Sequence, residues 1–332
     1  MENTVKNTLE IKGLKTHFFT RRGVVPAVDG VDITIPKASI VGIVGESGCG
    51  KSMTAMSVMQ LLQYPGRIVE GEIKLDGENL VGKTKAEMCN VRGNDISMIF
   101  QEPMTSLNPV YTVGKQVTEA IRLHQDVSLE EAKKMTIDIF REVGIPEPEK
   151  RYSSYPHQLS GGLRQRVMIG MAMVCKPKLM IADEPTTALD VTIEAQILHL
   201  MRKLKEETGT SIMLITHNLG VVAEVCDYVY VMYAGKVMEA APVRELFKNP
   251  SHPYTFGLLN SIPKTTYTKD ELYTIKGMVP NLQQLPSGCR FCPRCEKTMR
   301  VCTGEMPELM DIGNGHLVRC YLYDKEVVGA YE

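Results

Sequence analysis

A glycine-rich run followed by a lysine is the part of this chain best suited to bind a phosphorylated ligand. The sequence GESGCGKS begins at Gly45 and fits G-x-x-x-x-G-K-[ST], a pattern that wraps the phosphates of a nucleoside triphosphate. Gly45, Gly48 and Gly50 let successive backbone N–H groups turn inward, where a Cβ would clash. Lys51 adds a mobile cation for the β- and γ-phosphates, and the Ser52 hydroxyl suits Mg²⁺.

Two adjacent carboxylates, Asp183 and Glu184, follow an apolar run that begins at Lys178. At the tip of a strand, Asp183 is suited to hold Mg²⁺ through water opposite Ser52. Glu184 points to the other face of the strand and is a candidate to polarise an attacking water. Paired acids at a strand end can instead be solvated or cap a helix, since Pro-Thr-Thr follows them. A phosphate loop in the same chain favours the catalytic interpretation.

The strands that would position these residues can be located from their apolar runs. Buried strands are expected at Ser39–Val44, Asp95–Phe100, Lys178–Ala182 and Ser211–Thr216, with further strand-like stretches at Leu9–Phe19 and Tyr228–Met232. A helix is expected directly after Lys51, with its N-terminal dipole pointing at the phosphates. The stretch between Gln101 and Pro177 has no strong buried strand and is predicted to be a mostly helical insertion.

Two longer helices are expected between the strands. Over Ser128–Val143, Ser128 and Glu131 make a capping box, and Gly144 provides a stop. A second helix is expected over Thr192–Glu207. Strands alternating with helices predict an α/β fold with a largely parallel sheet.

Composition narrows the class of protein. The chain has 332 residues, enough for about two domains, and 43% hydrophobic with 23% charged residues is ordinary for a soluble globular protein. The net charge of -1 gives no reason to expect nucleic acid as the main partner. No apolar run approaches the ~20 residues of a membrane helix, and the polar start does not look like a secretory signal, so a cytosolic chain is expected.

Beyond about Ala240 prolines become frequent, and most of the cysteines follow. Of the nine cysteines, five lie in this C-terminal part, namely Cys289, Cys292, Cys295, Cys302 and Cys320. Thiolates at short spacings in a reducing compartment indicate a metal site. Zinc and a four-thiolate iron–sulfur cluster are both compatible with the spacing, and scattered cysteines without a ligand are the alternative.

Several motifs together resemble those of the ABC ATPases. LSGGLRQR, which begins at Leu159, resembles their signature sequence; Gln101 lies in a segment similar to their Q-loop, Asp190 ends a segment similar to their D-loop, and His217 matches their switch histidine. The resemblance implies an ABC-type P-loop ATPase core over residues 1–245, with a helical subdomain at about 102–176. This chain departs from the commonest signature at Leu163, where glutamine is frequent.

The resemblance also implies roles for individual residues. The catalytic residues would be Glu184, His217 and Gln101, and Mg²⁺ would be held by Ser52, Gln101 and Asp183. The ATP site would comprise Phe18, Gly45, Glu46, Ser47, Gly48, Cys49, Gly50, Lys51, Ser52 and Met53. Ser160, Gly161 and Gly162 would contact the γ-phosphate bound to an opposite subunit, so that ATP joins a head-to-tail dimer. For Phe18, which lies in a His-Phe-Phe triplet, core packing is as good an interpretation as stacking on adenine.

The C-terminal part resembles the extension of the oligopeptide and dipeptide importer ATPases. The similarity includes NPSHPYTFGLLNSIP, from Asn249, and implies a second domain over residues 246–332. Four cysteines match positions at which some members hold a [4Fe–4S] cluster, namely Cys289, Cys295, Cys302 and Cys320. Cys292 stands where histidine is frequent and would be the spare thiol, and Zn²⁺ is the alternative metal.

The implied function is an ATPase subunit that powers import of di- and oligopeptides from the cytoplasmic face of the membrane. The implied partners are two membrane permease subunits, a second, related ATPase in a heterodimer rather than a homodimer, and, indirectly, an extracytoplasmic peptide-binding protein. Uptake of nickel or another small solute is the nearest alternative. A soluble ABC protein acting on ribosomes or DNA is disfavoured, because a single cassette with a net charge of -1 is present. A module with a dead nucleotide site is the third alternative.

Overall fold

The structure is a computed structural model that describes residues 6–101, 106–186, 190–261, 273–324 and 327. The chain packs into two compact units that interleave along the sequence. Among the described residues, unit 1 comprises 6–9, 35–40 and those within 75–215, and unit 2 comprises 10–34, 41–74 and those within 216–327. No helix in the described part of the chain is long and apolar enough to cross a membrane.

Three parallel strands form the core of unit 1. They are β6 (Ile96–Ile99), β7 (Leu179–Asp183) and β8 (Ser211–Ile215), in the order β8-β7-β6. Every residue of β7 and β8 is buried, as expected for parallel strands with both faces covered. The register pairs Asp183 with Ile215, so both strands end at the same edge.

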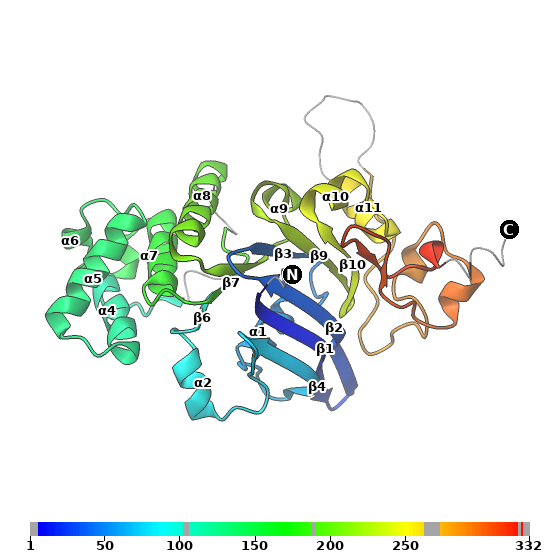
Figure 1. The fold of residues 1–332 in the computed structure, drawn as a ribbon, viewed down its shortest axis with the longest axis horizontal. Coiled ribbons are helices and arrows are strands. Elements are labelled where there is room, and N and C mark those ends of the chain that lie inside the picture. Colours follow the sequence, from blue (N-terminus) through cyan, green and yellow to red (C-terminus); the bar gives the residue numbers. More distant parts are fainter. Residues whose placement is uncertain (1–5, 102–105, 187–189, 262–272, 325–326, 328–332) are drawn as a thin grey trace, which may run out of the picture. The chain divides into compact units, whose positions relative to one another are not determined.

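The other elements of unit 1 are helices and one short strand (Figure 1). They are α2 (Lys85–Val91), α4 (Val113–His124), α5 (Leu129–Glu142), α6 (Pro148–Arg151), α7 (Gly161–Met173) and α8 (Val191–Thr208), and the two-residue β5 (Glu78–Asn79) also belongs here. The capping box on α5 is present, with the Ser128 side chain accepting from Glu131 N, and Gly144 beyond the helix has φ 73°. The described residues between 106 and 177 contain no strand, so the predicted helical insertion is confirmed.

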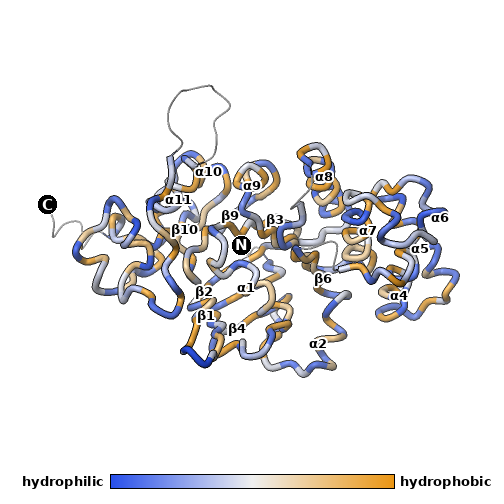
Figure 2. The backbone as a smooth tube through the Cα atoms, turned by 180° about the vertical axis from the view of Figure 1, so that it is seen from behind, coloured by the Kyte–Doolittle hydropathy of each residue, from blue (hydrophilic) through white to orange (hydrophobic). Residues whose placement is uncertain are grey.

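Unit 2 carries a strand group of mixed direction. Its members are β3 (Ile40–Val44), β9 (Tyr228–Tyr233), β10 (Lys236–Pro242), β11 (Met310–Asp311) and β12 (Leu317–Val318), in the order β11-β12-β10-β9-β3. β3 pairs with β9 in parallel, whereas β10, β12 and β11 add antiparallel. All five residues of β3 are buried, and Figure 2 colours this strand as hydrophobic.

A second sheet in unit 2 orders its strands β2-β1-β4, with β1 (Asn7–Thr20), β2 (Gly23–Pro36) and β4 (Gly66–Leu75). The helices of the unit are α1 (Lys51–Val58), α9 (Leu219–Val225), α10 (Val243–Lys248) and α11 (Pro253–Asn260). A buried hydrogen bond between Thr16 Oγ1 and Ser57 Oγ, 2.7 Å long, joins β1 to α1. This bond fixes the helix that follows the phosphate loop.

A fully buried carboxylate holds the C-terminal part of unit 2 together. Glu239, on β10, accepts hydrogen bonds from Ser251 N at 2.6 Å and His252 N at 2.9 Å, and its other contact is His316 Nε2 at 2.7 Å. One side chain therefore joins β10, the start of α11 and the loop before β12.

Replacing Glu239 with alanine should lower the free energy of unfolding by about 3 kcal/mol or more, because two buried N–H groups and an imidazole lose their acceptor. Urea unfolding followed by circular dichroism measures the change. The control is Glu70→Ala. The Glu70 side chain is 65% exposed and forms a surface ion pair with Lys15, so its loss should lower the free energy of unfolding by about 1 kcal/mol or less. Equal losses in the two variants would contradict the role given to Glu239.

Candidate functional site

The phosphate loop in unit 2 has the backbone shape that its glycines predict. Gly45 has φ 147°, and a Cβ there would lie 2.1 Å from Met232 O, so a side chain cannot be accommodated. Gly50 has φ 107° and its Cβ would lie 2.5 Å from Ala27 O. Gly48 has φ 77° with open space around it, so only its backbone angle requires glycine. The loop therefore combines tight packing at both ends with an exposed middle.

Lys51 begins helix α1 and turns its amino group back into the loop. Its Nζ donates to Gly45 O at 2.7 Å and to Glu46 O at 3.1 Å, and the residue is only 6% exposed. The helix has Gly50 as its N-cap, as expected for a helix that directs its first N–H groups toward phosphate. The cation is thus held beside the loop backbone, where the sequence predicts phosphate oxygens.

The remaining loop residues divide into exposed and buried ones. Ser47 is exposed, and Ser52 and Met53 are half-buried near the start of α1. Cys49 is fully buried, its N–H donates to Glu46 O at 3.3 Å, and burial raises the pKa of its thiol. Cys49 therefore shapes the turn with its backbone, and its side chain belongs to the core.

In unit 1, the structure brings together two of the predicted catalytic side chains. Asp183 is the last residue of β7 and is buried. Glu184 follows it, and Gln101, two residues beyond β6, donates from Nε2 to Glu184 Oε2 at 3.0 Å. A carboxylate held by an amide at the carboxyl edge of a parallel sheet can orient a water for attack on a phosphate.

Glu184 also has an unusual backbone conformation. Its φ is 47°, in the left-handed region that non-glycine residues rarely adopt, and its N–H donates to Ile215 O at 2.8 Å. Strained angles of this kind concentrate at functional sites. No residue type in the sequence signals this strain, so it could not be predicted.

The signature residues begin helix α7. Ser160 is the N-cap, and its hydroxyl accepts from Leu163 N at 3.4 Å. Ser160 and Gly161 are exposed, and a Cβ at Gly162 would lie 3.0 Å from Ile193 Cγ2. The predicted placement of this motif at a helix N-terminus is confirmed, and it suits anion binding.

Other signature and D-loop residues fix the surroundings of this helix. Gln165 is buried and donates to Pro185 O, which joins α7 to the residue after Glu184. Asp190 caps α8 by accepting from Ile193 N at 2.9 Å, and the remainder of the predicted D-loop, residues 188–189, lies outside the described residues. The sequence did not predict the contact between Gln165 and Pro185. The only signal for Gln165 was its position in the signature motif.

Two further predicted residues lie in unit 2. His217 is exposed and follows Thr216, whose N–H donates to Ile43 O at 3.3 Å. Phe18 is half-buried, and its ring lies so close to Gly66 that a Cβ there would be 2.6 Å from Phe18 Cε1. The ring has a packing partner and an exposed part, so adenine stacking by Phe18 stays a prediction.

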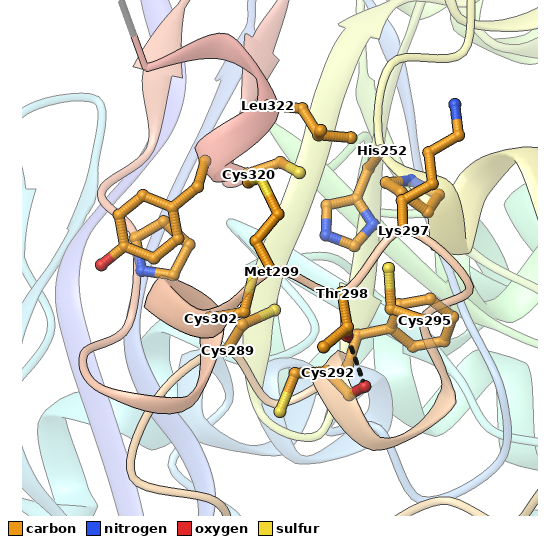
Figure 3. Close-up of a pocket in the computed structure, with 14 residues that line it drawn as sticks. His252, Cys289, Cys292, Cys295, Lys297, Thr298, Met299, Cys302, Cys320 and Leu322 are labelled. Carbon is orange, nitrogen blue, oxygen red and sulfur yellow. Dashed lines mark hydrogen bonds between the residues drawn. The ribbon is translucent and has the colours of Figure 1, made fainter. Parts of the chain in front are cut away.

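The five C-terminal cysteines line a single pocket, together with His252 and Met299 (Figure 3). Burial raises the pKa of the Cys289 thiol to about 12, with smaller contributions from Cys320, Cys302 and Cys292. The pKa of Cys320 rises to about 11 for the same main reason. The Cys289 and Cys320 thiols are therefore protonated near neutral pH, and a bound cation would favour their thiolate forms.

The side chains around this pocket are not positioned as the ligands of one metal ion. Within the described ranges, no group of three or more His, Cys, Asp or Glu side chains is placed to hold a metal ion. The pocket that the cysteines help to line has a volume of about 10 Å³, which suits about one water. The donor chemistry fits a thiolate-bound metal, but the geometry does not support the expected iron–sulfur cluster or zinc ion.

The chain is similar to known families along most of its length. The family described as "ABC transporter" matches residues 28–187, and "Oligopeptide/dipeptide transporter, C-terminal region" matches residues 238–302. The oligopeptide transport ATP-binding protein AppD of Bacillus subtilis is 52% identical over 319 residues, which cover 96% of this chain and 97% of the relative. The oligopeptide transport ATP-binding protein OppD of Haemophilus influenzae is 48% identical and covers 95% of this chain and 97% of the relative.

Solved structures resemble the chain over a smaller part. The dimeric ABC transporter cassette MJ0796 aligns with a TM-score of 0.64 and 27% identity, over 71% of this chain and 99% of the cassette. The structure of cbiO1 from Clostridium perfringens, part of the ABC transporter complex cbiONQ, aligns with a TM-score of 0.63 and 26% identity, over 74% of this chain and 92% of that one. The fold of an ABC ATPase cassette is therefore established.

Proposed function

Because the chain belongs to the oligopeptide and dipeptide branch of the ABC transporter ATP-binding proteins, we propose that it powers peptide import through a membrane complex. The chain is an ATPase of the ABC type. The observation that carries the proposal is the presence of both the cassette and the peptide-transporter C-terminal region in one polypeptide that matches its relatives almost end to end.

The proposed chemistry assigns roles to residues of both units. Lys51 and the loop N–H groups of residues 45–52 bind the triphosphate. Glu184, oriented by the Gln101 amide 3.0 Å away, positions the attacking water. Ser52, Gln101 and Asp183 would hold Mg²⁺, which supplies charge neutralisation on the phosphates when bound.

The assembly is part of the proposal. Ser160 and its two glycines form an exposed helix N-terminus, which suits a γ-phosphate held by a second ATPase subunit. We expect that subunit to be a related chain rather than an identical copy, with His217 contacting the phosphate of its own loop. The proposed assembly also contains two membrane permease subunits and, indirectly, an extracytoplasmic peptide-binding protein. The chain would lie at the cytoplasmic face of the membrane.

Reconstitution tests the import function. The chain is co-expressed with its neighbouring permease, ATPase and binding-protein genes, and the purified complex is placed in liposomes with ATP on the ATPase side. Labelled di- and oligopeptides should accumulate only with ATP, and nickel should not. Nickel uptake without peptide uptake would favour the solute alternative, and a chain that purifies with ribosomes or DNA instead of permeases would contradict import.

The cysteine pocket belongs to the proposal as well. We propose that Cys289, Cys295, Cys302 and Cys320 hold a [4Fe–4S] cluster, with Zn²⁺ as the alternative and Cys292 as the spare thiol. Support comes from the donor chemistry, since five thiols line one pocket and burial, with a smaller contribution from Cys320, raises the pKa of the Cys289 thiol. A bound metal would stabilise a segment that has little secondary structure of its own.

Serine variants test the ligand set. After anaerobic purification, the chain should contain iron and acid-labile sulfide and absorb visible light, because four thiolates hold the cluster. Cys302→Ser should lose most of the iron, whereas Cys292→Ser should keep it. Stoichiometric zinc without a visible chromophore would show that the site holds Zn²⁺ instead of a cluster. Finding neither iron nor zinc would refute the metal site.

A further inference from the structure

Three contacts converge on Glu46, the second residue of the phosphate loop. Its N–H donates to Tyr254 Oη at 2.9 Å, and its carbonyl accepts from Lys51 Nζ at 3.1 Å. Its two carboxylate oxygens accept from both terminal nitrogens of Arg294, at 2.6 and 3.1 Å. The loop is therefore held on one side by its own lysine and on the other by two residues far along the chain.

Arg294 is itself fixed by its surroundings. Its side chain is 5% exposed, whereas that of Glu46 is 28% exposed. Its Nε donates to Lys276 O at 3.0 Å, and its guanidinium lies 5.8 Å from the centre of the Tyr233 ring. The residue lies in the short turn between Cys292 and Cys295. The pair is thus a two-point, charge-assisted contact with little freedom on the arginine side.

An aromatic cluster supports the same contact. Tyr254 is fully buried, and its ring centre lies 4.7 Å from that of Tyr233 and 5.3 Å from that of Phe291. Tyr233 ends β9, and Phe291 belongs to the cysteine-rich segment. The hydroxyl that accepts from Glu46 N is therefore presented by a rigid group and not by a mobile loop.

We propose that Arg294 is a positioning residue for the phosphate loop, which it holds in its nucleotide-binding shape through Glu46. The proposal rests on the nucleotide-binding role proposed for residues 45–52. The carbonyls of Gly45 and Glu46 determine where the Lys51 amino group lies. Losing the pair with Arg294 frees the Glu46 peptide to rotate and moves the lysine away from the phosphates. The cysteine-rich segment is then a working part of the ATP site.

A double-mutant cycle measures this coupling. Arg294→Gln, Glu46→Gln and the double variant are made in the full chain, and ATP affinity is measured by calorimetry beside thermal unfolding of the nucleotide-free protein. Each single variant should weaken ATP binding about tenfold, and the double variant should be little worse than either, because both changes remove one interaction. In steady-state turnover the loss should fall on KM more than on kcat.

Two matched variants complete the experiment. Arg319→Gln is the structural control, because Arg319 is a half-buried arginine that also precedes a cysteine but donates to Val237 O and Pro307 O instead of the loop. It should keep parental ATP affinity even if its melting temperature falls. Lys51→Ala is the reference for the loop. If it loses ATP binding while Arg294→Gln and Glu46→Gln both bind as the parent does, this inference fails and the loop assignment stands.

Additive effects in the double variant, or a loss in Arg319→Gln as large as in Arg294→Gln, would also overturn the inference. If Arg294→Gln does not fold, Glu46→Gln decides the question, because it leaves the cysteine-rich segment unchanged. A tenfold loss of affinity with unchanged melting would support the proposal, and parental affinity would refute it.

Discussion

Replacing Glu184 with glutamine should lower the turnover number for ATP by about 10²–10⁴-fold, the usual contribution of a general base, while ATP still binds. The amide keeps the shape of the side chain and can still accept from Gln101, so the site stays assembled. What it loses is the charge that orients and polarises water. Steady-state phosphate release measures turnover, and calorimetry with ATP measures binding.

Association provides a second measurement for the same variant. Because hydrolysis is proposed to release two ATPase subunits, Glu184→Gln should accumulate as a closed, ATP-bound pair in size-exclusion chromatography. Glu149→Gln is a suitable control, since that carboxylate pairs with Arg141 at the surface of the same unit. Parental turnover in Glu184→Gln would show that another group activates the water.

Replacing Lys51 with alanine should weaken ATP binding by about 100-fold or more, since a charge that faces the β- and γ-phosphates is removed from a site with little solvent. The amino group is already directed at the loop carbonyls of Gly45 and Glu46, so only a short movement separates it from a bound phosphate. Fluorescent nucleotide titration measures the change.

The matched control for this variant is Lys12→Ala, which removes a 65% exposed lysine from strand β1 of the same unit. It should bind ATP as the parent chain does. If both lysine variants bind ATP normally, the loop at Gly45 is not the triphosphate site, whatever its backbone shape.

The elements that carry the nucleotide chemistry could be predicted because their sequences are locally distinctive. Buried parallel strands such as β3 and β8 are continuous apolar runs, and the glycines of the phosphate loop reflect backbone angles that other residues avoid. The capping box at Ser128 specified the start of α5. In each case the signal lies within a few consecutive residues.

Strands with mixed faces were missed. β4 reads GRIVEGEIKL and has only two buried residues, while β10 contains the buried Glu239, so neither resembles an apolar run. β4 lies beside β1, which is distant in sequence, and β10 pairs with the distant β12 as well as with the neighbouring β9. Pairing of this kind depends on tertiary context that a single-sequence pattern does not contain.

Long-range polar contacts were missed for the same reason. Glu46 and Arg294 are 248 positions apart, and no local sequence pattern near either residue predicts their contact. The cysteines are the opposite case. Their spacing predicted a metal centre, and the structure gathers them around one pocket without a ligating arrangement. Thiolates converge on a metal mainly when it binds, so geometry at such a site depends on loading as well as on sequence.

The distance in sequence between Glu46 and its partners has a meaning for protein synthesis. During translation the ribosome delivers the loop early, but Tyr254 and Arg294 emerge only 208 and 248 residues later. A nascent chain therefore carries the phosphate loop without these two contacts through most of its elongation, so under the role proposed for Arg294 the loop is not yet held in its nucleotide-binding shape.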